Sequence, residues 1–353
     1  MLELDRKELL ASLSPLQTLL KKQSDQDSGS GCLTYDSGRF YCRAMDFHLT
    51  SLAPKCFKDV ESFSVSGDFV SFLQRTTADT IQLEFGDVIK VKVKRSNTKF
   101  ATKDDKGDLL FSRTVFEFPK KWTDIPDPSA FFTSFEKLGK MSAKTMSGRY
   151  PALSAVHVHR NKMEASDIKQ YLSMELDEPV TEEDLLIPAT AFGFIKSINP
   201  DKYQVEDNQI FFKSDTGLIG SCPLLGGDFP DMGNMLTAKG HTVKVSKFIH
   251  EAVARCAVFT SRFRFDEEKT FTIKFVSDHV VISAISAYGS TEVPVKARYP
   301  EEMEGRVIRV NPDLFEECLS HSLEILVAES SIRVQTDTSC YVAVLKSEVK
   351  HHE

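Results

Sequence analysis

Long apolar runs are missing from this chain of 353 residues, since no stretch approaches the length that a membrane-spanning helix needs. Such a helix takes about 20 mainly apolar residues, so we expect no membrane partner. The first ten residues, MLELDRKELL, place an acid at position 3 and lack the apolar core of a signal peptide. We therefore expect a cytoplasmic protein.

Paired cysteines are missing too. The seven cysteines are odd in number, and none are spaced C-x-x-C. This pattern is typical of reduced thiols inside a cell and contains no zinc or redox motif.

Recognisable catalytic motifs are also lacking: G-x-x-x-x-G-K-[ST], H-E-x-x-H and G-x-S-x-G do not occur. His157 and His159 lie on one face of a predicted strand, but two ligands are too few for a catalytic metal, which favours a solvated strand face. The sequence predicts a protein that is not an enzyme, with no catalytic residue, no metal and no cofactor.

A threefold internal repeat is what the chain does contain. VSGDFVSFLQ, IPATAFGFIK and VNPDLFEECL each predict the start of a helix, and they begin at Val65, Ile187 and Val310, offsets of 122 and 123 residues. Each is followed by a run that alternates apolar and polar residues around a turn, as hairpins do.

Two further elements precede each of these helices in the same order. Paired strands are predicted at 38–54, 161–176 and 278–295, and an amphipathic helix comes before each pair. The sequence therefore predicts an α+β fold of three repeated modules, each with two helices packed on antiparallel sheets. The predicted modules are residues 1–123, 124–241 and 242–353.

This order resembles the bacterial sliding clamps, the DNA polymerase III β subunit family, over nearly the whole chain. Short motifs carry the resemblance besides the helix starts: Ala165-Ser166-Asp167, where the family has A-T-D, Phe229-Pro230-Asp231 between the second and third modules, and Tyr341-Val342-Ala343-Val344 in the last strand. The resemblance implies that each chain is half of a ring. A second copy, joined head to tail, would close it around DNA.

The function that the resemblance implies is that of a processivity factor in DNA replication. The implied partners are duplex DNA without sequence preference, a second copy of the chain, the replicative DNA polymerase, an ATP-driven clamp loader and other proteins with a clamp-binding motif. The implied location is the cytoplasm of a bacterial cell, or of an infected host cell if a phage encodes the chain. Two other hypotheses remain open: a monomeric β-rich scaffold that binds DNA or protein without forming a ring, and an enzyme without a recognisable motif.

The charge pattern bears on DNA binding, although the formal net charge is −7. Acids gather in the predicted loops 177–184, 265–269 and 300–305, whereas lysines and arginines favour the helices. In the helix 131–144, for example, three lysines lie opposite an apolar face. The candidate DNA-binding residues are Lys7, Lys21, Lys22, Arg75, Lys137, Lys140, Lys144, Arg149, Lys196, Lys247 and Arg255. Taken singly, each is better explained as a solubility residue, and only the bias that recurs across the three modules favours DNA binding.

The segment GGDFPDMGNML (226–236) combines turn-forming glycines with closely spaced apolar side chains. The resemblance implies that it helps to form a pocket for short peptide tails of polymerases and other DNA enzymes. The implied pocket residues are Leu153, Ser166, Tyr171, Pro230, Met235, Val342, Val344 and Leu345. The alternative is that the segment only seals a junction between two domains.

The implied dimer interface consists of Phe100 on one chain and Val258 and Phe259 on the other. The alternative places these three side chains in the core of their own module.

Three departures from the family affect the pocket. The chain has Asp167-Ile168-Lys169-Gln170-Tyr171 where the family has D-G-H-R-L, Met232-Gly233-Asn234 where an arginine is expected, and a tail, LKSEVKHHE, in place of a short apolar end. They indicate a divergent peptide preference and fit a distant or bacteriophage clamp.

Overall fold

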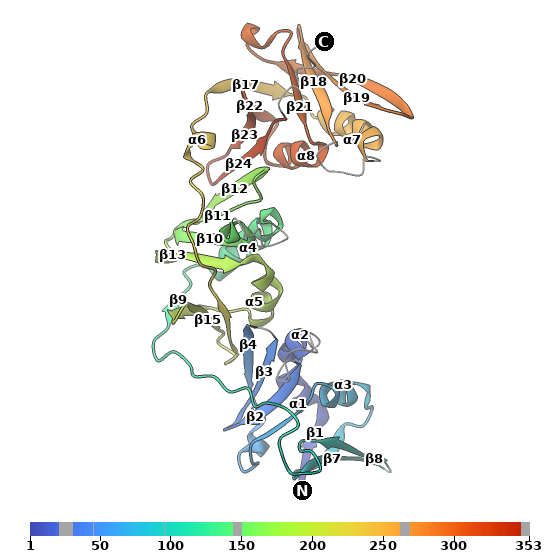
Figure 1. Cartoon of the computed structure of the whole chain (residues 1–353), viewed down its shortest axis with the longest axis vertical. Coiled ribbons are helices and arrows are strands. Elements are labelled where there is room, and N and C mark those ends of the chain that lie inside the picture. The colour runs from blue at the N-terminus through green and yellow to red at the C-terminus, as the bar shows by residue number, and fades with distance from the viewer. Residues whose placement is uncertain (21–30, 45, 95, 144–149, 262–268, 347–353) are drawn as a thin grey trace. The chain divides into compact units, whose positions relative to one another are not determined.

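The computed structural model describes residues 1–20, 31–44, 46–94, 96–143, 150–261 and 269–346. The chain divides into two compact units, one formed by Met1–Thr133 with Ile187–Leu225 and the other by Ser134–Leu186 with Gly226–Glu353. Figure 1 shows the chain and labels most of the helices and strands.

The first repeat runs from β1 to β8. Its elements are β1 (Leu2–Asp5), α1 (Arg6–Leu13), η1 (Ser14–Leu16), α2 (Gln17–Leu20), β2 (Cys32–Asp36), β3 (Arg39–Ala44), β4 (Phe47–Leu52), η2 (Lys55–Phe57), β5 (Phe63–Ser66), α3 (Asp68–Arg75), β6 (Thr80–Glu84), β7 (Val88–Val93) and β8 (Ser96–Ala101).

The second repeat runs from β9 to β16. Its elements are β9 (Thr123–Asp124), α4 (Pro128–Met141), η3 (Pro151–Ser154), β10 (Ala155–Arg160), β11 (Lys162–Ser166), β12 (Gln170–Glu175), β13 (Thr181–Pro188), η4 (Ala189–Ala191), α5 (Phe192–Ile198), β14 (Lys202–Glu206), β15 (Gln209–Lys213) and β16 (Ile219–Pro223).

The third repeat follows a connector, residues 226–239, that contains the short helix α6 (Gly233–Leu236). Its elements are β17 (Gly240–Val245), α7 (Ile249–Thr260), β18 (Phe271–Val276), β19 (His279–Ser286), β20 (Gly289–Arg298), η5 (Glu301–Met303), β21 (Val307–Val310), α8 (Pro312–His321), β22 (Glu324–Ala328), β23 (Ser331–Gln335) and β24 (Ser339–Val344).

The three repeats share one succession of main elements: strand, helix, three strands, strand, helix, three strands. The predicted α+β repeat of helices and antiparallel sheets is therefore confirmed. The limits 1–123, 124–241 and 242–353 stay a prediction for the extent of each module.

The first unit contains an eight-stranded sheet, in the order β5-β2-β3-β4-β16-β15-β14-β9, and a four-stranded sheet, β1-β6-β7-β8. In the eight-stranded sheet, β4 of the first repeat pairs antiparallel with β16 of the second, so that Leu49 lies opposite Gly220. A Cβ at Gly220 would come within 2.5 Å of the Phe194 ring and 2.6 Å of Ile198. Only glycine lets α5 pack this closely on the joint between the two repeats.

The second unit is built on a twelve-stranded sheet in the order β13-β10-β11-β12-β24-β23-β22-β17-β20-β19-β18-β21. Here β12 of the second repeat pairs antiparallel with β24 of the third, so that Leu172 lies opposite Tyr341. Each joint thus continues a sheet from one repeat into the next.

Local signals explain where several helices begin and end. The Asp5 carboxylate accepts hydrogen bonds from the amides of Lys7 and Glu8 at the start of α1. Pro15 interrupts the first helical stretch: α1 ends at Leu13, and a 3₁₀ turn follows. Asn311 caps α8 in the same way as Asp5, with Pro312 in the first turn.

No helix in the described ranges is both long and apolar enough to cross a membrane. Cys56 is exposed, and the other six cysteines are buried and unbridged. Burial raises the pKa of the Cys222 thiol to about 12, so that this thiol stays protonated and unreactive at neutral pH.

Candidate functional site

The candidate DNA-binding residues that the structure describes lie on or next to helices, with exposed side chains. Lys7 belongs to α1, Arg75 to α3 and Lys196 to α5; Lys247 lies two residues before the start of α7, and Arg255 is within it. Lys21, Lys22, Lys144 and Arg149 lie outside the described residues. Some of these cations have acidic partners nearby: Lys7 Nζ is 3.3 Å from Asp79 Oδ1, and Arg255 pairs with Glu251 one turn away.

Helix α4 has the predicted two faces. Phe131, Phe135 and Leu138 are buried, whereas Lys137 and Lys140 are exposed. Helix α8 brings a carboxylate, Glu317, close to both lysines. Contact with His321, whose Nε2 lies 3.5 Å from Glu317 Oε1, lowers the pKa of Glu317, and the two lysine charges add to this effect. The basic surface of α4 therefore has an acid beside it.

The connector lies on an apolar cluster of the second unit. Tyr171 of β12 stands opposite Val342 of β24, and together with Cys340 these two buried side chains form the cluster. Four half-buried connector residues pack against it: Phe229, Met232, Met235 and Leu236. Of the predicted pocket residues, the structure thus brings Tyr171, Met235 and Val342 together.

The other predicted pocket residues are not part of this cluster in the described structure. Leu153 is buried in η3, Leu345 is buried directly after β24, and Pro230 and Val344 are half-buried. Ser166 stands opposite Tyr171 on β11.

Ser166 has a local role that its sequence did not indicate. Its hydroxyl donates to the Gln170 carbonyl, 2.7 Å away, and accepts from the Ile168 amide. The hydroxyl therefore stabilises the turn between β11 and β12, and the place of Ser166 in the pocket stays a prediction. The turn also exposes Ile168 to 62%, with φ at +79°. Positive φ is uncommon for a residue other than glycine, and we did not predict this exposed apolar residue from the sequence.

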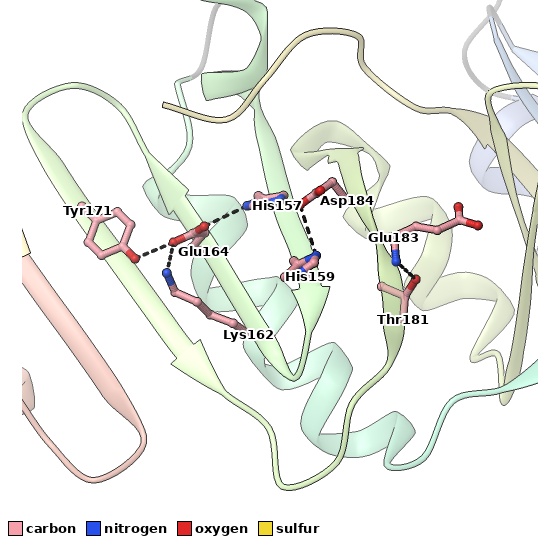
Figure 2. Close-up of polar contacts among 8 residues, drawn as sticks. All are labelled: His157, His159, Lys162, Glu164, Tyr171, Thr181, Glu183 and Asp184. Atoms are coloured by element: carbon pink, nitrogen blue, oxygen red, sulfur yellow. Dashed lines mark hydrogen bonds and ion pairs between the residues drawn. The ribbon is translucent and has the colours of Figure 1, made fainter. Parts of the chain in front are cut away.

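A polar network extends from the apolar cluster across three strands and on to β13 (Figure 2). The Tyr171 hydroxyl donates to Glu164 Oε2 at 2.5 Å, and Lys162 Nζ lies 2.5 Å from the same oxygen. His157 Nδ1 is 2.8 Å from Glu164 Oε1, and His157 Nε2 is 3.0 Å from Asp184 Oδ1.

This network shifts the ionisation of its members. Burial alone would raise the pKa of Glu164, but hydrogen bonds from His157, Lys162 and Tyr171 outweigh it and lower the pKa to about 2. Burial alone would lower the pKa of His157, but the hydrogen bonds and charges of Glu164 and Asp184 outweigh it, so this pKa is raised. Glu164 is thus held as an anion and His157 is favoured as a cation.

The expectation of a solvated face for the two strand histidines is wrong for His157. Its side chain is only 13% exposed and lies between two carboxylates. His159 is 39% exposed, and its Nδ1 lies 3.2 Å from Asp184 Oδ1. The cause is long-range: β11 and β13 supply the acids, and strand period alone does not identify them. Within the described ranges, no three His, Cys, Asp or Glu side chains are arranged to hold a metal ion.

The three predicted interface residues are half-buried or exposed within the chain. Phe100 on the edge strand β8 is half-buried and packs edge-on against Phe69 and Phe72 of α3. Val258 on α7 is 64% exposed, and its neighbour Phe259 is half-buried.

Two more apolar side chains of the third repeat are exposed near the hairpin between β19 and β20. Ile285 is 75% exposed and Tyr288 is 77% exposed. The alternating pattern of HVVISAIS gave a signal that we did not use, because Ile285 falls on the strand face opposite the buried Val280, Ile282 and Ala284.

We predict that Glu164→Gln destabilises the protein by about 3 kcal/mol near neutral pH, because it leaves His157 and Lys162 without their buried counter-charge. The difference from wild type should be largest between the ordinary pKa values of a carboxyl and an imidazole. It should shrink as the pH falls from 4.5 toward 2, where Glu164 becomes protonated, and as the pH rises above 6.5 through the raised pKa of His157.

Urea denaturation from acid to alkaline pH measures this difference. The control is Glu183→Gln, because the Glu183 carboxylate on β13 points away from the network (Figure 2). A Glu164→Gln protein as stable as the control at pH 6 would contradict the prediction.

Comparison with solved structures gives extensive matches. A putative DNA polymerase III β subunit from Eubacterium rectale superposes with a TM-score of 0.79 at 11% identity, covering 98% of this chain and 99% of that one. The β subunit of Caulobacter crescentus gives 0.79 at 14% identity, covering 98% and 100%. A Pseudomonas aeruginosa sliding clamp bound to griselimycin gives 0.75 at 15% identity, covering 98% and 99%.

Sequence comparison finds less: no protein-family model and no curated protein sequence matches the chain. At 11–15% identity, similarity to the solved structures establishes the fold, and it does so over nearly the whole length of both partners. The predicted resemblance is confirmed at this level, and the chain has the fold of the DNA polymerase III β sliding clamps.

Proposed function

We propose that this protein is a DNA sliding clamp: a head-to-tail homodimeric ring that encircles duplex DNA and tethers the replicative polymerase through a peptide pocket on the second unit. A protein with this role works in the cytoplasm of a bacterial cell or of a phage-infected one. It would be a processivity factor and not an enzyme. The observation that carries the proposal is the strand register at the two joints between repeats.

Both joints pair strands of neighbouring repeats in the same register. The hairpins β2–β3, β10–β11 and β18–β19 each close on a two-residue turn, which makes Cys42, Ala165 and Ile282 equivalent positions. Their partners on the next strand, Leu49 of β4, Leu172 of β12 and Val293 of β20, are therefore equivalent too. The last strands of the repeats align in the same way, which makes Gly220 of β16 and Tyr341 of β24 equivalent. Both joints then pair equivalent positions, Leu49 with Gly220 and Leu172 with Tyr341.

The same pairing could occur a third time, because two strands, β20 and β8, lack such a partner in the described chain. On its outer edge, β20 pairs only with β17, at Ala297 and Arg298, and β8 is the edge of its sheet. When β6 and β14 are aligned from their first residues, Thr80 and Lys202, the position of β8 that is equivalent to Gly220 is Ser96. We infer that β20 of one chain pairs with β8 of another, Val293 opposite Ser96 and Gly289 opposite Phe100. Edge strands with free backbone groups are templates for such pairing.

Side chains next to these strands suit this contact. A Cβ at Gly289 would lie 3.3 Å from the Phe259 ring, so a Phe100 opposite Gly289 would meet Phe259. Exposed Val258, Ile285 and Tyr288 extend the apolar surface nearby. Two chains joined twice in this way form a closed ring of six repeats.

We predict that Lys99→Cys with Ser290→Cys, made in a Cys56→Ser background, forms a covalent dimer under mild oxidation. The inferred register places residues 99 and 290 opposite each other, and opposite Cα atoms in antiparallel strands are about 5 Å apart, within disulfide reach. Denaturing gel electrophoresis measures the cross-link.

The matched control is Asn97→Cys with Ser290→Cys, displaced by two residues and so about 7–8 Å apart, which should cross-link poorly. Separately, Phe259→Arg should give a folded monomer in light scattering. An unaltered Phe259→Arg dimer, or equal cross-linking of both cysteine pairs, would refute the register. A stable monomer of the wild-type chain would favour the scaffold alternative.

DNA contact is proposed for the exposed cations of the helices, with Lys137 and Lys140 on α4 as the main pair described. Contacts to phosphates need no base recognition, which a protein that slides along DNA must avoid. Acids beside these cations, such as Glu317 and Glu136, keep each contact moderate.

We predict that Lys137→Gln with Lys140→Gln weakens DNA binding and makes the slope of log K against log salt shallower by about two, because each lost phosphate contact releases about one fewer counterion. Binding to circular duplex DNA, measured at several salt concentrations, provides the slope. Lys274→Gln with Lys296→Gln is the control, since these exposed lysines lie on strands. Equal slopes for the two double variants would place the contacts elsewhere.

Peptide capture is proposed at the apolar cluster and connector. Aliphatic and methionine side chains form an adaptable apolar surface, and exposed Ile168 lies in the turn that leads to Tyr171. Partners would be the polymerase, the ATP-driven clamp loader and other proteins that bear a short tail with one or two apolar anchors. So small a contact supports an affinity of about micromolar.

We predict that Met235→Asp with Leu345→Asp abolishes polymerase stimulation and leaves the dimer and its DNA binding intact. Leu345 is buried, so Met235→Asp alone, at a half-buried site, is the second variant. Long-tract synthesis with the cognate polymerase measures the loss. Because griselimycin binds the P. aeruginosa clamp, its binding by calorimetry gives a second measurement. Normal synthesis by both variants would place the pocket elsewhere and leave the connector as a seal.

A further inference from the structure

A ring of contacts joins the connector to the polar network beneath it. The rings of His157 and Phe229 stack, with centroids 5.1 Å apart and planes at 17°. His157 also contacts Glu164, which accepts from the hydroxyl of Tyr171. The cluster that contains Tyr171 in turn packs against Phe229. His157 therefore links the connector to the polar network of the second unit.

The hydrogen-bond geometry of His157 favours the imidazolium form. Both ring nitrogens lie within 3.0 Å of a carboxylate oxygen, Glu164 Oε1 at Nδ1 and Asp184 Oδ1 at Nε2. A neutral imidazole has one N–H and one lone pair, so one of these contacts would set a lone pair against an anion. The charged form satisfies both carboxylates and also places a cation over the Phe229 ring, where the ring quadrupole attracts it.

We propose that His157 is a positioning residue whose proton holds the connector, residues 226–239, on the apolar cluster of the second unit. When His157 loses that proton, the contact with buried Glu164 is retained through Nδ1–H. The contact with Asp184, which is 73% exposed, is lost because this carboxylate is free to turn into solvent. The attraction of Phe229 to a cation is lost at the same step, so the connector loosens while the strands stay in place.

The surroundings of His157 contain other charged groups. On its own strand, the His159 ring is 6.5 Å away and shares Asp184. On β11, Lys162 is paired with Glu164. From β12, Tyr171 adds a hydroxyl whose pKa burial raises, so it stays neutral. On the connector, Asp228 and Asp231 flank the stacked residue Phe229 and its neighbour Pro230, and Asp231 accepts from the Gly233 amide.

The functional consequence, which rests on the proposed function, is that pH adjusts one wall of the peptide pocket. At lower pH the connector is held in place and Met235 stays on the cluster. A peptide that binds then has less conformational entropy of the connector to overcome. A bound peptide should then be held more tightly below the titration of His157 than above it.

Hydrogen exchange of the connector tests the proposal on the whole protein without a ligand, so the result does not depend on whether the pocket binds peptides. The amides of Met235, Leu236 and Thr237 donate to backbone carbonyls within the connector and serve as probes. After correction for intrinsic rates, their exchange in wild type should rise about five- to tenfold from pH 6 to pH 9, the range expected for losing a cation–aromatic contact.

Four variants separate the contributions. His157→Gln and Phe229→Leu should show fast exchange at both pH values, without the rise. His159→Gln, and His279→Gln beside Asp278 on β19, should keep the wild-type profile. A flat profile in wild type, a rise that persists in His157→Gln, or a rise that disappears in His159→Gln would each overturn the proposal. If the exchange behaves as expected but polymerase stimulation does not depend on Met235, the role of His157 in holding the connector stands and the pocket assignment fails.

Discussion

The pairing of strand edges at the joints between repeats is the constraint on which the rest of the structure depends. A strand that ends a sheet leaves a row of backbone N–H and C=O groups, and leaving these groups without partners away from water is costly. The chain satisfies this need twice, by pairing β4 with β16 and β12 with β24. These joints fix the order of the strands in the two sheets that they continue. The positions of the helices that carry the cations, and of the strands that carry the apolar cluster, follow from that order.

The joints also explain what was predictable from the sequence. The helix starts at Val65, Ile187 and Val310 recur because each repeat needs the same strand-to-helix turn. A period near 122 residues can therefore be read from this single sequence. Alternation of apolar and polar residues predicted the hairpins, and an apolar face predicted α4. These signals are local, and a short window of residues contains each one completely.

The site was less predictable because its contacts are long-range. Nothing near His157 in the sequence indicates that Asp184 will cap one ring nitrogen while Phe229 stacks on the ring. In the same way, the residue type of Ser166 did not indicate that its hydroxyl would be used within its own turn. The apolar residues of the connector pack on Tyr171 and Val342, which both interpretations of this segment, peptide pocket and seal, allow. Family motifs located this region, but only the fold revealed how its polar and apolar parts are linked.

The carboxylate of Glu317 beside Lys137 and Lys140 has a consequence for motion along DNA in the proposed role. A phosphate that approaches these lysines meets an anion that already competes for them, so each binding well is shallow. Shallow wells spaced along a regular helix give a smooth energy profile, and the barrier between one position and the next is small. Removing the acid would deepen every well, so a ring without Glu317 would hold DNA more tightly and diffuse along it more slowly.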